Sequence, residues 1–170
     1  MSKNILFYTI KKRIIDKRGY FQELYNKNFF LPNIHFVQDN YSFSKKKNTF
    51  RGFHYQEEPF SQSKLVFVIK GQILDLAIDL RNNSKTFMKT FKFKIRDVDN
   101  KLLFIPNGFA HGFLTLKDDT EVFYKVDNFY SKKHERGINV KDPKFNFFSK
   151  RILNKLILSK KDREMPFFNI

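Results

Sequence analysis

Two histidines in aromatic, glycine-marked stretches are the side chains best suited to moving a proton in this chain. His54 lies in RGFHYQEE and His111 lies in IPNGFAHGF, and the whole chain has four histidines. Because an imidazole titrates near neutral pH, each ring could serve as an acid, a base or a metal ligand. Taken alone, a strand histidine between Phe53 and Tyr55 is better explained as a hydrogen-bonded residue of the core.

The two histidines do not make a complete metal site. Pro106, Gly108 and His111 follow a PxGxxH spacing similar to the second motif of the cupin barrel, whose histidines often bind a metal. A metal-binding cupin generally has a second histidine two residues after the first. Here that position is Gln56, followed by two glutamates that could offer only carboxylates. Two imidazoles without a matching third ligand suit zinc or iron poorly, so we predict no metal site.

Several common catalytic motifs are absent from the sequence. It has no GxxxxGKS/T phosphate loop, no GxGxxG, no GxSxG and no HExxH. These absences argue against nucleotide hydrolysis, Rossmann hydride transfer and the common serine and zinc hydrolases. The chain also lacks cysteine, which excludes disulfides and thiolate metal sites.

The chain is strongly basic, with 33 Lys and Arg against 17 Asp and Glu and a formal charge of +16. Such a balance suggests an anionic partner such as phosphate, nucleic acid or a lipid surface. The lysines are scattered, however, and the abundance of Lys, Asn, Ile and Phe is typical of AT-rich coding. We therefore interpret most of the charge as a solvated surface and expect neither nucleic acid nor a membrane as a partner.

The elements that must position these groups follow a period of two. In QILDLAIDL, Leu74, Leu76, Ile78 and Leu80 fall on one face and Asp75 falls on the other, as in a strand. Turn signals such as KGQ, RNNS, DVDN, PNG and KDDT separate these runs. Further strand-like runs are IHFVQDNYSF, KLVFVIK, FKFKIR, KLLFIP, GFLTL and EVFYKV.

Many short strands without helices between them predict an antiparallel sandwich or barrel. Only SKRILNKLILSKKDREM could hold helix, where Ser159 followed by Asp162 suits an N-terminal cap. Without a linker or a repeat, we predict a single domain over residues 1–170. The N-terminal ILFYTI is too short for a signal peptide and no run could cross a bilayer, so we expect a cytoplasmic protein.

Five sequence blocks, in order and at matching spacing, give the chain its closest resemblance. They are VQDNYSFSKKKNTFRGFHYQ, KLVFVIKGQILDLAIDLR, FIPNGFAHGFLTL, YKVDNFYSKKHERGI and LSKKD. Together they resemble the dTDP-4-dehydrorhamnose 3,5-epimerase family over nearly the whole chain. The resemblance implies an all-β, antiparallel jelly roll of cupin type with a short C-terminal helical segment, which works as a homodimer without a metal or any other cofactor.

The family epimerises a nucleoside-diphosphate 4-keto-6-deoxy sugar at the carbons that flank the ketone. Such a reaction needs a base near the carbon, a cation or donor near the ketone oxygen, and an acid on the opposite ring face. The resemblance implies that His54 is the base and that Asp162 orients its imidazole. It further implies that Lys64 stabilises the enolate and that Tyr124 returns the proton.

The resemblance also suggests residues that bind the substrate. Arg51 suits a diphosphate or sugar contact. Strict alternation would put Arg51 and His54 on opposite faces, so both reach one pocket only if the strand starts or bulges near Gly52. Asp75 either assists in the pocket or satisfies a neighbour. The matching positions are Gln38, His111 and Tyr130 in the pocket, with Arg18, Phe21 and Glu23 in DKRGYFQEL, a segment expected to reach the partner subunit's site.

The chain departs from the family pattern at one place. The family commonly has a WNDP-like stretch where this chain has INVKDP, so an aromatic is replaced at Val140, which we interpret as a packing position. Related enzymes act at one carbon only, or on sugars such as a GDP-linked 4-keto-6-deoxy-heptose, and the sequence does not separate these activities. A non-catalytic sugar-binding barrel and a nucleic-acid-binding β-barrel also stay open as functions.

Overall fold

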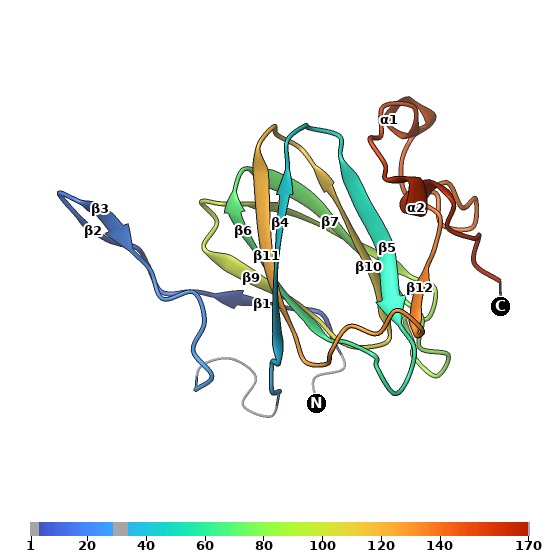
Figure 1. Cartoon of the computed structure of the whole chain (residues 1–170), viewed down its shortest axis with the longest axis horizontal. Coiled ribbons are helices and arrows are strands. Elements are labelled where there is room, and N and C mark those ends of the chain that lie inside the picture. Colours follow the sequence, from blue (N-terminus) through green and yellow to red (C-terminus); the bar gives the residue numbers. More distant parts are fainter. Residues whose placement is uncertain (1–3, 29–33, 170) are drawn as a thin grey trace.

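Two five-stranded antiparallel sheets face each other in the computed structural model, which describes residues 4–28 and 34–169 (Figure 1). The predicted all-β, antiparallel architecture is confirmed. One sheet has the spatial order β1 (Leu6–Thr9), β9 (Lys101–Ile105), β6 (Lys64–Lys70), β11 (Thr120–Val126) and β4 (Gln38–Ser44). The other has the order β12 (Glu135–Gly137), β5 (Phe50–Gln56), β10 (Phe109–Thr115), β7 (Gln72–Asp79) and β8 (Thr90–Arg96).

A two-stranded hairpin and two short helices lie outside these sheets. The hairpin of β2 (Ile14–Asp16) and β3 (Gly19–Phe21) projects away from the barrel (Figure 1). The helices α1 (Lys150–Leu153) and α2 (Lys160–Arg163) form the short C-terminal helical segment that was predicted. At the start of α2 the Asp162 amide donates to the Ser159 hydroxyl at 3.0 Å, which confirms the predicted cap. Within the described residues, no helix is long and apolar enough to cross a membrane.

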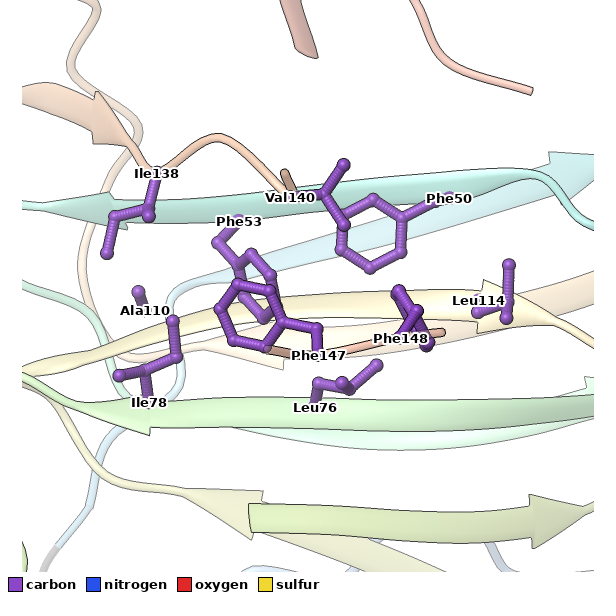
Figure 2. Close-up of a cluster of buried hydrophobic side chains, with 10 residues drawn as sticks. All are labelled: Phe50, Phe53, Leu76, Ile78, Ala110, Leu114, Ile138, Val140, Phe147 and Phe148. Carbon is purple, nitrogen blue, oxygen red and sulfur yellow. The ribbon is translucent and has the colours of Figure 1, made fainter. Parts of the chain in front are cut away.

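Strand β7 is buried on both of its faces. Ile73 and Ala77 pack between the two sheets, in a cluster with side chains from β6, β8, β9, β10 and β11. Leu76 and Ile78 pack on the opposite face, against residues from the C-terminal part of the chain (Figure 2). The leucine stripe of the sequence therefore faces the outer cover of the second sheet, and the face that carries Asp75 points into the barrel.

The hydrophobic cluster between the second sheet and the C-terminal residues that cover its outer face is rich in aromatic rings (Figure 2). The rings of Phe53 and Phe147 lie 4.3 Å apart between centroids, and those of Phe50 and Phe148 lie 5.9 Å apart. Val140 is 2% exposed within the same cluster, as expected for a packing position. Each side chain of this size contributes roughly 2 kcal/mol when buried. This cluster thus holds the C-terminal segments on either side of α2 against the second sheet.

Strand β5 bulges near Gly52, which is one of the two ways in which Arg51 and His54 could share a pocket. His54 pairs with His111 and Arg51 pairs with Phe113, so three steps along β5 match two along β10. Gly52 has φ of +135°, and a Cβ atom there would lie 2.5 Å from the Gly112 Cα. Only glycine fits such a backbone and such a close approach. Because of the extra residue, Arg51 and His54 both face the interior of the barrel.

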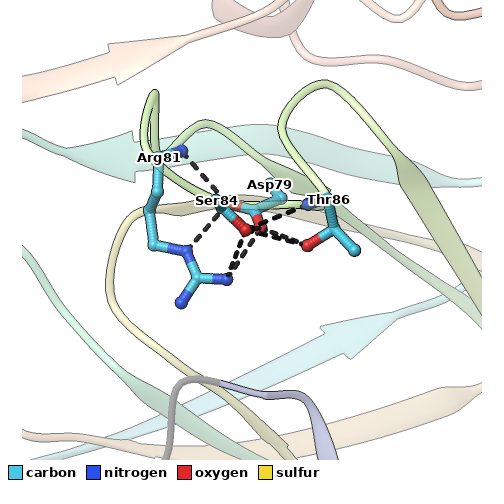
Figure 3. Close-up of polar contacts among 4 residues, drawn as sticks. All are labelled: Asp79, Arg81, Ser84 and Thr86. Carbon is cyan, nitrogen blue, oxygen red and sulfur yellow. Dashed lines mark hydrogen bonds and ion pairs between the residues drawn. The ribbon is translucent and has the colours of Figure 1, made fainter.

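A carboxylate at one end of β7 fixes the turn that follows it (Figure 3). The Asp79 carboxylate accepts from Arg81 Nε at 2.8 Å and Nη2 at 2.7 Å, and from the Ser84 and Thr86 hydroxyls at 2.6 Å each. Burial raises the pKa of Asp79, but the hydrogen bonds from Arg81, Ser84 and Thr86 hold it well below its ordinary value. In this cluster, named the Asp79 cluster, hydrogen bonds satisfy the buried carboxylate, so its charge serves the structure.

Candidate active site

Two adjoining hollows open between the sheets and share the side chains of His54, Lys64 and Tyr124. The wider hollow has a volume of about 420 Å³ and the narrower one about 320 Å³. The remaining lining of the wider hollow is Tyr41, Ser42, Phe43, Arg51, His111, Phe113, Ser159, Lys161 and Asp162. The narrower hollow is completed by Gln38, Asn40, Tyr55, Gln56, Gln62, Tyr130 and Glu135.

His54 forms a dyad with Asp162. Its Nε2 lies 2.8 Å from Asp162 Oδ1, and the two side chains are 31% and 6% exposed. The capping bond from the Asp162 amide to the Ser159 hydroxyl holds the main chain of Asp162 at the start of α2. Because the carboxylate accepts from Nε2–H, the neutral ring carries its lone pair on Nδ1. The dyad can therefore take up a proton on a ring whose orientation and charge Asp162 supports.

Lys64 is a buried cation with little to neutralise it. Its Nζ donates to the His54 carbonyl oxygen at 3.3 Å, and the residue is 8% exposed. Burial lowers the pKa of Lys64 to about 8, although the negative charges of Asp75 and Glu135 act in the opposite direction. An ammonium held in this way can offer its charge to an oxygen that becomes negative during a reaction.

Tyr124 lies on the first sheet beside Lys64. It stands opposite Val66 on β6, and Lys64 stands opposite Val126, so the two side chains share one face of the sheet. Burial raises the pKa of the Tyr124 phenol, with the positive charge of Arg51 lowering it and the negative charge of Glu135 raising it. The phenol is therefore protonated at neutral pH and can act as a proton donor.

The second histidine is buried and paired with a carboxylate behind it. His111 Nε2 lies 2.8 Å from Asp75 Oδ2, and the side chains are 7% and 0% exposed. His111 lines the wider hollow, whereas Asp75 lies one layer deeper and contacts neither hollow. Among the described residues, Asp75 Oδ1 has no hydrogen-bond partner.

The predicted binding residues divide between the two hollows. Arg51 lines the wider one, where its Nε donates to the Ser44 hydroxyl at 3.1 Å and its Nη2 donates to the Phe43 carbonyl at 2.9 Å. Gln38 and Tyr130 line the narrower one and are joined by a 3.2 Å bond from the Tyr130 amide to Gln38 Oε1. The bulge in β5 is what allows Arg51 to share the site with His54.

The pocket contains an ion pair that no sequence pattern singles out. Lys161 Nζ lies 2.6 Å from Glu135 Oε1, and the Tyr130 hydroxyl donates to Glu135 Oε2 at 2.8 Å. Burial raises the pKa of Glu135, but the hydrogen bonds from Lys161 and Tyr130 leave it below its ordinary value. Both residues fall within the motif blocks HERGI and LSKKD, yet charged residues are so frequent here that nothing marks these two.

The predicted N-terminal residues lie away from this pocket. Phe21 is 69% exposed on the hairpin of β2 and β3, and Arg18 is exposed and paired with Asp16, its Nη2 lying 2.6 Å from Oδ2. Glu23 Oε1 lies 3.1 Å from Lys11 Nζ. None of the three predicted residues lines either hollow of its own chain.

The residues that the structure describes contain no group of three His, Cys, Asp or Glu side chains arranged to hold a metal ion. Gln56 stands where a metal-binding cupin has its second histidine, and its side-chain amide is bonded to main-chain groups. Its Nε2 donates to the carbonyls of Phe60 and Phe129, and its Oε1 accepts from the Ser131 amide. The imidazoles of His54 and His111 are each held by a carboxylate instead.

Comparison with known proteins gives a consistent result. The family model described as dTDP-4-dehydrorhamnose 3,5-epimerase matches residues 4–169. The enzyme of that name from Shigella flexneri is 44% identical over 135 residues, which cover 77% of this chain and 74% of that protein. The one from Sinorhizobium fredii is 40% identical over 154 residues, covering 89% and 78%.

Solved structures of the same kind superpose closely on this fold. A crystal structure of dTDP-4-dehydrorhamnose 3,5-epimerase from Bacillus anthracis, with TDP and PPi bound, gives a TM-score of 0.83 at 35% identity and covers 96% of this chain and 100% of that one. A dTDP-6-deoxy-D-glucose-3,5-epimerase from Legionella pneumophila, in complex with dTDP-4-keto-L-rhamnose, gives 0.85 at 30% identity and covers 96% and 87%.

Proposed function

The chain belongs to the dTDP-4-dehydrorhamnose 3,5-epimerase family, and from this membership we propose which side chains carry the reaction. The enzyme is an isomerase that epimerises a dTDP-4-keto-6-deoxy sugar at C3, C5 or both. A hydrogen beside a ketone is acidic because the carbanion delocalises into an enolate. The reaction therefore requires a base, a stabilised oxyanion and a separate acid.

In the proposed path His54 removes the proton from the carbon beside the ketone. The 2.8 Å contact with Asp162 holds the ring in one tautomer and stabilises the imidazolium that forms. Lys64 donates to the ketone oxygen as it becomes an enolate. Its burial supports this role, because a charge acts more strongly in a pocket with little water.

Tyr124 then returns a proton to the other face of the ring. Its support is geometric, because Tyr124 stands on the first sheet and His54 stands on the second, across the hollows that both residues line. Removal of a proton on one side and its return on the other invert the carbon. A phenol with a raised pKa is a weak acid, but an enolate carbon is basic enough to receive its proton.

The wider hollow suits the diphosphate of the substrate. Arg51 and Lys161 bring two cations to it, and guanidinium groups form paired hydrogen bonds with phosphate oxygens. His111 and Arg51 would then contact the sugar nucleotide in this hollow, with Asp75 acting through His111. Gln38 and Tyr130 would contact it in the narrower hollow, where amide and hydroxyl groups predominate.

We also propose that the enzyme is a homodimer in which the N-terminal hairpin reaches the partner subunit's site. The hairpin exposes apolar surface at Ile14, Ile15, Tyr20 and Phe21, which are 59% to 78% exposed in the single chain. A surface of this kind favours burial against another protein. Arg18, Phe21 and Glu23 would then contact the nucleotide bound by the partner.

The observation that carries the residue assignments is the division of the pocket, with His54 of the dyad on one sheet and the Lys64 and Tyr124 pair on the other. The test is incubation with dTDP-4-keto-6-deoxyglucose in deuterium oxide, with a GDP-linked 4-keto sugar in parallel. We expect deuterium at C3, C5 or both of the dTDP sugar, and the pattern defines the regiochemistry. Binding without exchange would instead indicate a non-catalytic sugar-binding protein.

A further inference from the structure

Gln56 occupies a buried position at the end of β5, two residues after His54. It is 6% exposed, and the partners of its side-chain amide among the described residues are all main-chain groups. Nε2 donates to the Phe60 carbonyl at 2.6 Å and to the Phe129 carbonyl at 3.1 Å, while Oε1 accepts from the Ser131 amide at 2.6 Å. Both N–H groups of the amide are thus committed to two loops, residues 57–63 and residues 127–134.

Two of these bonds bracket a residue of the pocket. Phe129 and Ser131 are the neighbours of Tyr130, so the amide of Gln56 holds the main chain on both sides of that tyrosine. Tyr130 is 53% exposed, which means that packing alone does not fix it. Its hydroxyl donates to Glu135 at 2.8 Å, and Glu135 is the residue that pairs with Gln56 across β12 and β5.

The two loops are also bound to each other. Gln62 Nε2 donates to the Asn128 carbonyl at 2.8 Å, and Asn128 Nδ2 donates to the Pro59 carbonyl at 2.9 Å. The rings of Phe60 and His134 stack with centroids 4.6 Å apart. The loops therefore behave as one wall of the narrower hollow, and Gln56 joins that wall to the strand that carries His54.

We propose that Gln56 is a positioning residue that sets the wall carrying Tyr130 relative to His54. The inference rests on the proposed function, because the contact of Tyr130 with the sugar nucleotide belongs to that proposal. An amide suits the task because one planar group donates twice and accepts once, which neither a histidine nor a glutamate at this position can do. Loss of the amide lets the wall shift, and small shifts of a binding wall weaken substrate binding.

The test is a double-mutant cycle on the binding of dTDP-glucose, an unreactive sugar nucleotide, measured by calorimetry. Gln56→Met keeps the length of the side chain and removes all three bonds, and Gln56→Asn, with an amide one methylene shorter, is the second variant. We expect Gln56→Met and Tyr130→Ala each to raise the Kd about tenfold, and the double variant to raise it no more than about 20-fold. The proposal would be overturned if Gln56→Met left the Kd unchanged. It would also be overturned if the double variant raised the Kd about 100-fold, because the two effects would then be independent.

A matched control separates positioning from stability alone. The Asn139 amide also donates to two carbonyls, of Arg163 at 3.0 Å and Met165 at 2.9 Å, and accepts from the Lys141 amide at 2.9 Å. Asn139→Ala should lower Tm about as much as Gln56→Met, but without coupling to Tyr130→Ala. Equal coupling in both cycles would reduce Gln56 to a structural residue. Deuterium exchange by the wild type tests the proposed function separately, because the cycle requires no turnover.

Discussion

The Asp79 cluster and the His54 pocket both bury charged groups, but they satisfy them very differently. The Asp79 carboxylate accepts hydrogen bonds from Arg81, Ser84 and Thr86 (Figure 3). In the pocket, the Lys64 ammonium donates at 3.3 Å to one carbonyl. The buried polar atoms that lack a partner among the described residues, Ser42 Oγ and Asp75 Oδ1, lie in the pocket lining and directly behind it.

This difference distinguishes a charge that holds the fold from a charge kept for a ligand. A buried group with a full set of partners has nothing further to give, and breaking the set costs stability. A buried cation with few partners costs stability as it stands, but it can be satisfied by an oxyanion of the substrate. The pKa values follow the same division, because that of Asp79 is held low by its partners while that of Lys64 is lowered by burial to about 8.

The largest effect is expected for Lys64→Met, which tests the contrast between the two regions most directly. Removing the cation should lower kcat about 100-fold or more, as loss of an oxyanion donor does. It should also stabilise the folded chain by about 3 kcal/mol, because the cost of burying the ammonium, which lowers the pKa from 10.5 to about 8, disappears. Steady-state kinetics measure the loss of kcat, and urea unfolding measures the gain in stability. A variant that is both less active and less stable would show that Lys64 supports the fold as Asp79 does.

Asp79→Asn should give the opposite pattern. The substitution leaves the Arg81 guanidinium without its carboxylate and replaces acceptor lone pairs with N–H donors that face other donors. We expect a loss of about 3 kcal/mol in the free energy of unfolding, with unchanged kcat in the folded protein. Urea unfolding and kinetics on the same preparation provide the measurement. A loss of kcat at unchanged stability would remove the contrast between the two regions.

The pH dependence of activity and of stability should both reflect the buried Lys64. Below its folded-state pKa of about 8 the ammonium is charged, so kcat/KM should fall about tenfold per pH unit above that value. The same shift acts on stability with the opposite sign. Between about 8 and the ordinary value of 10.5 the unfolded chain binds more protons, so the Lys64 contribution to stability should rise with pH. Both trends should vanish in Lys64→Met, and their persistence there would assign them to another group.

The smallest expected effect concerns the cap at the start of α2, which contains Asp162. Ser159→Ala removes the acceptor of the Asp162 amide and should cost about 1 kcal/mol of stability. It should lower kcat only a few-fold, because the 2.8 Å bond to His54 still orients the carboxylate. Thermal melting and kinetics suffice for this variant. A loss of kcat as large as that of Lys64→Met would mean that the cap, and not the dyad bond, holds Asp162 in place.

The sequence predicted much of this arrangement, for identifiable reasons. Strand alternation and turn residues indicated an antiparallel sandwich or barrel, and the expectation that Arg51 and His54 share a pocket implied that the strand starts or bulges near Gly52, where the structure has a bulge. The alternation in β7 did not reveal that both faces are buried, because only the C-terminal cover, with Phe147 and Phe148, makes the leucine face internal.

The site was predictable only where a motif block marked a residue. His54, Lys64, Tyr124 and Asp162 lie far apart in the sequence, and the structure brings them to one pocket. Other contributors could not be found in the same way. Lys161 and Glu135 resemble surface charges in a chain with 33 Lys and Arg, and the bonds of Gln56 exist only once its two loops have folded.

Deuterium exchange by two variants tests whether His54 on one sheet is the base and Tyr124 on the other is the acid. His54→Asn and Tyr124→Phe are incubated with dTDP-4-keto-6-deoxyglucose in deuterium oxide, after thermal melting has shown that each variant is folded. We predict that His54→Asn lowers exchange at least about 100-fold at every position, while Tyr124→Phe still exchanges but forms little inverted product. Exchange by His54→Asn at the rate of the wild type would contradict the assignment of His54 as the base.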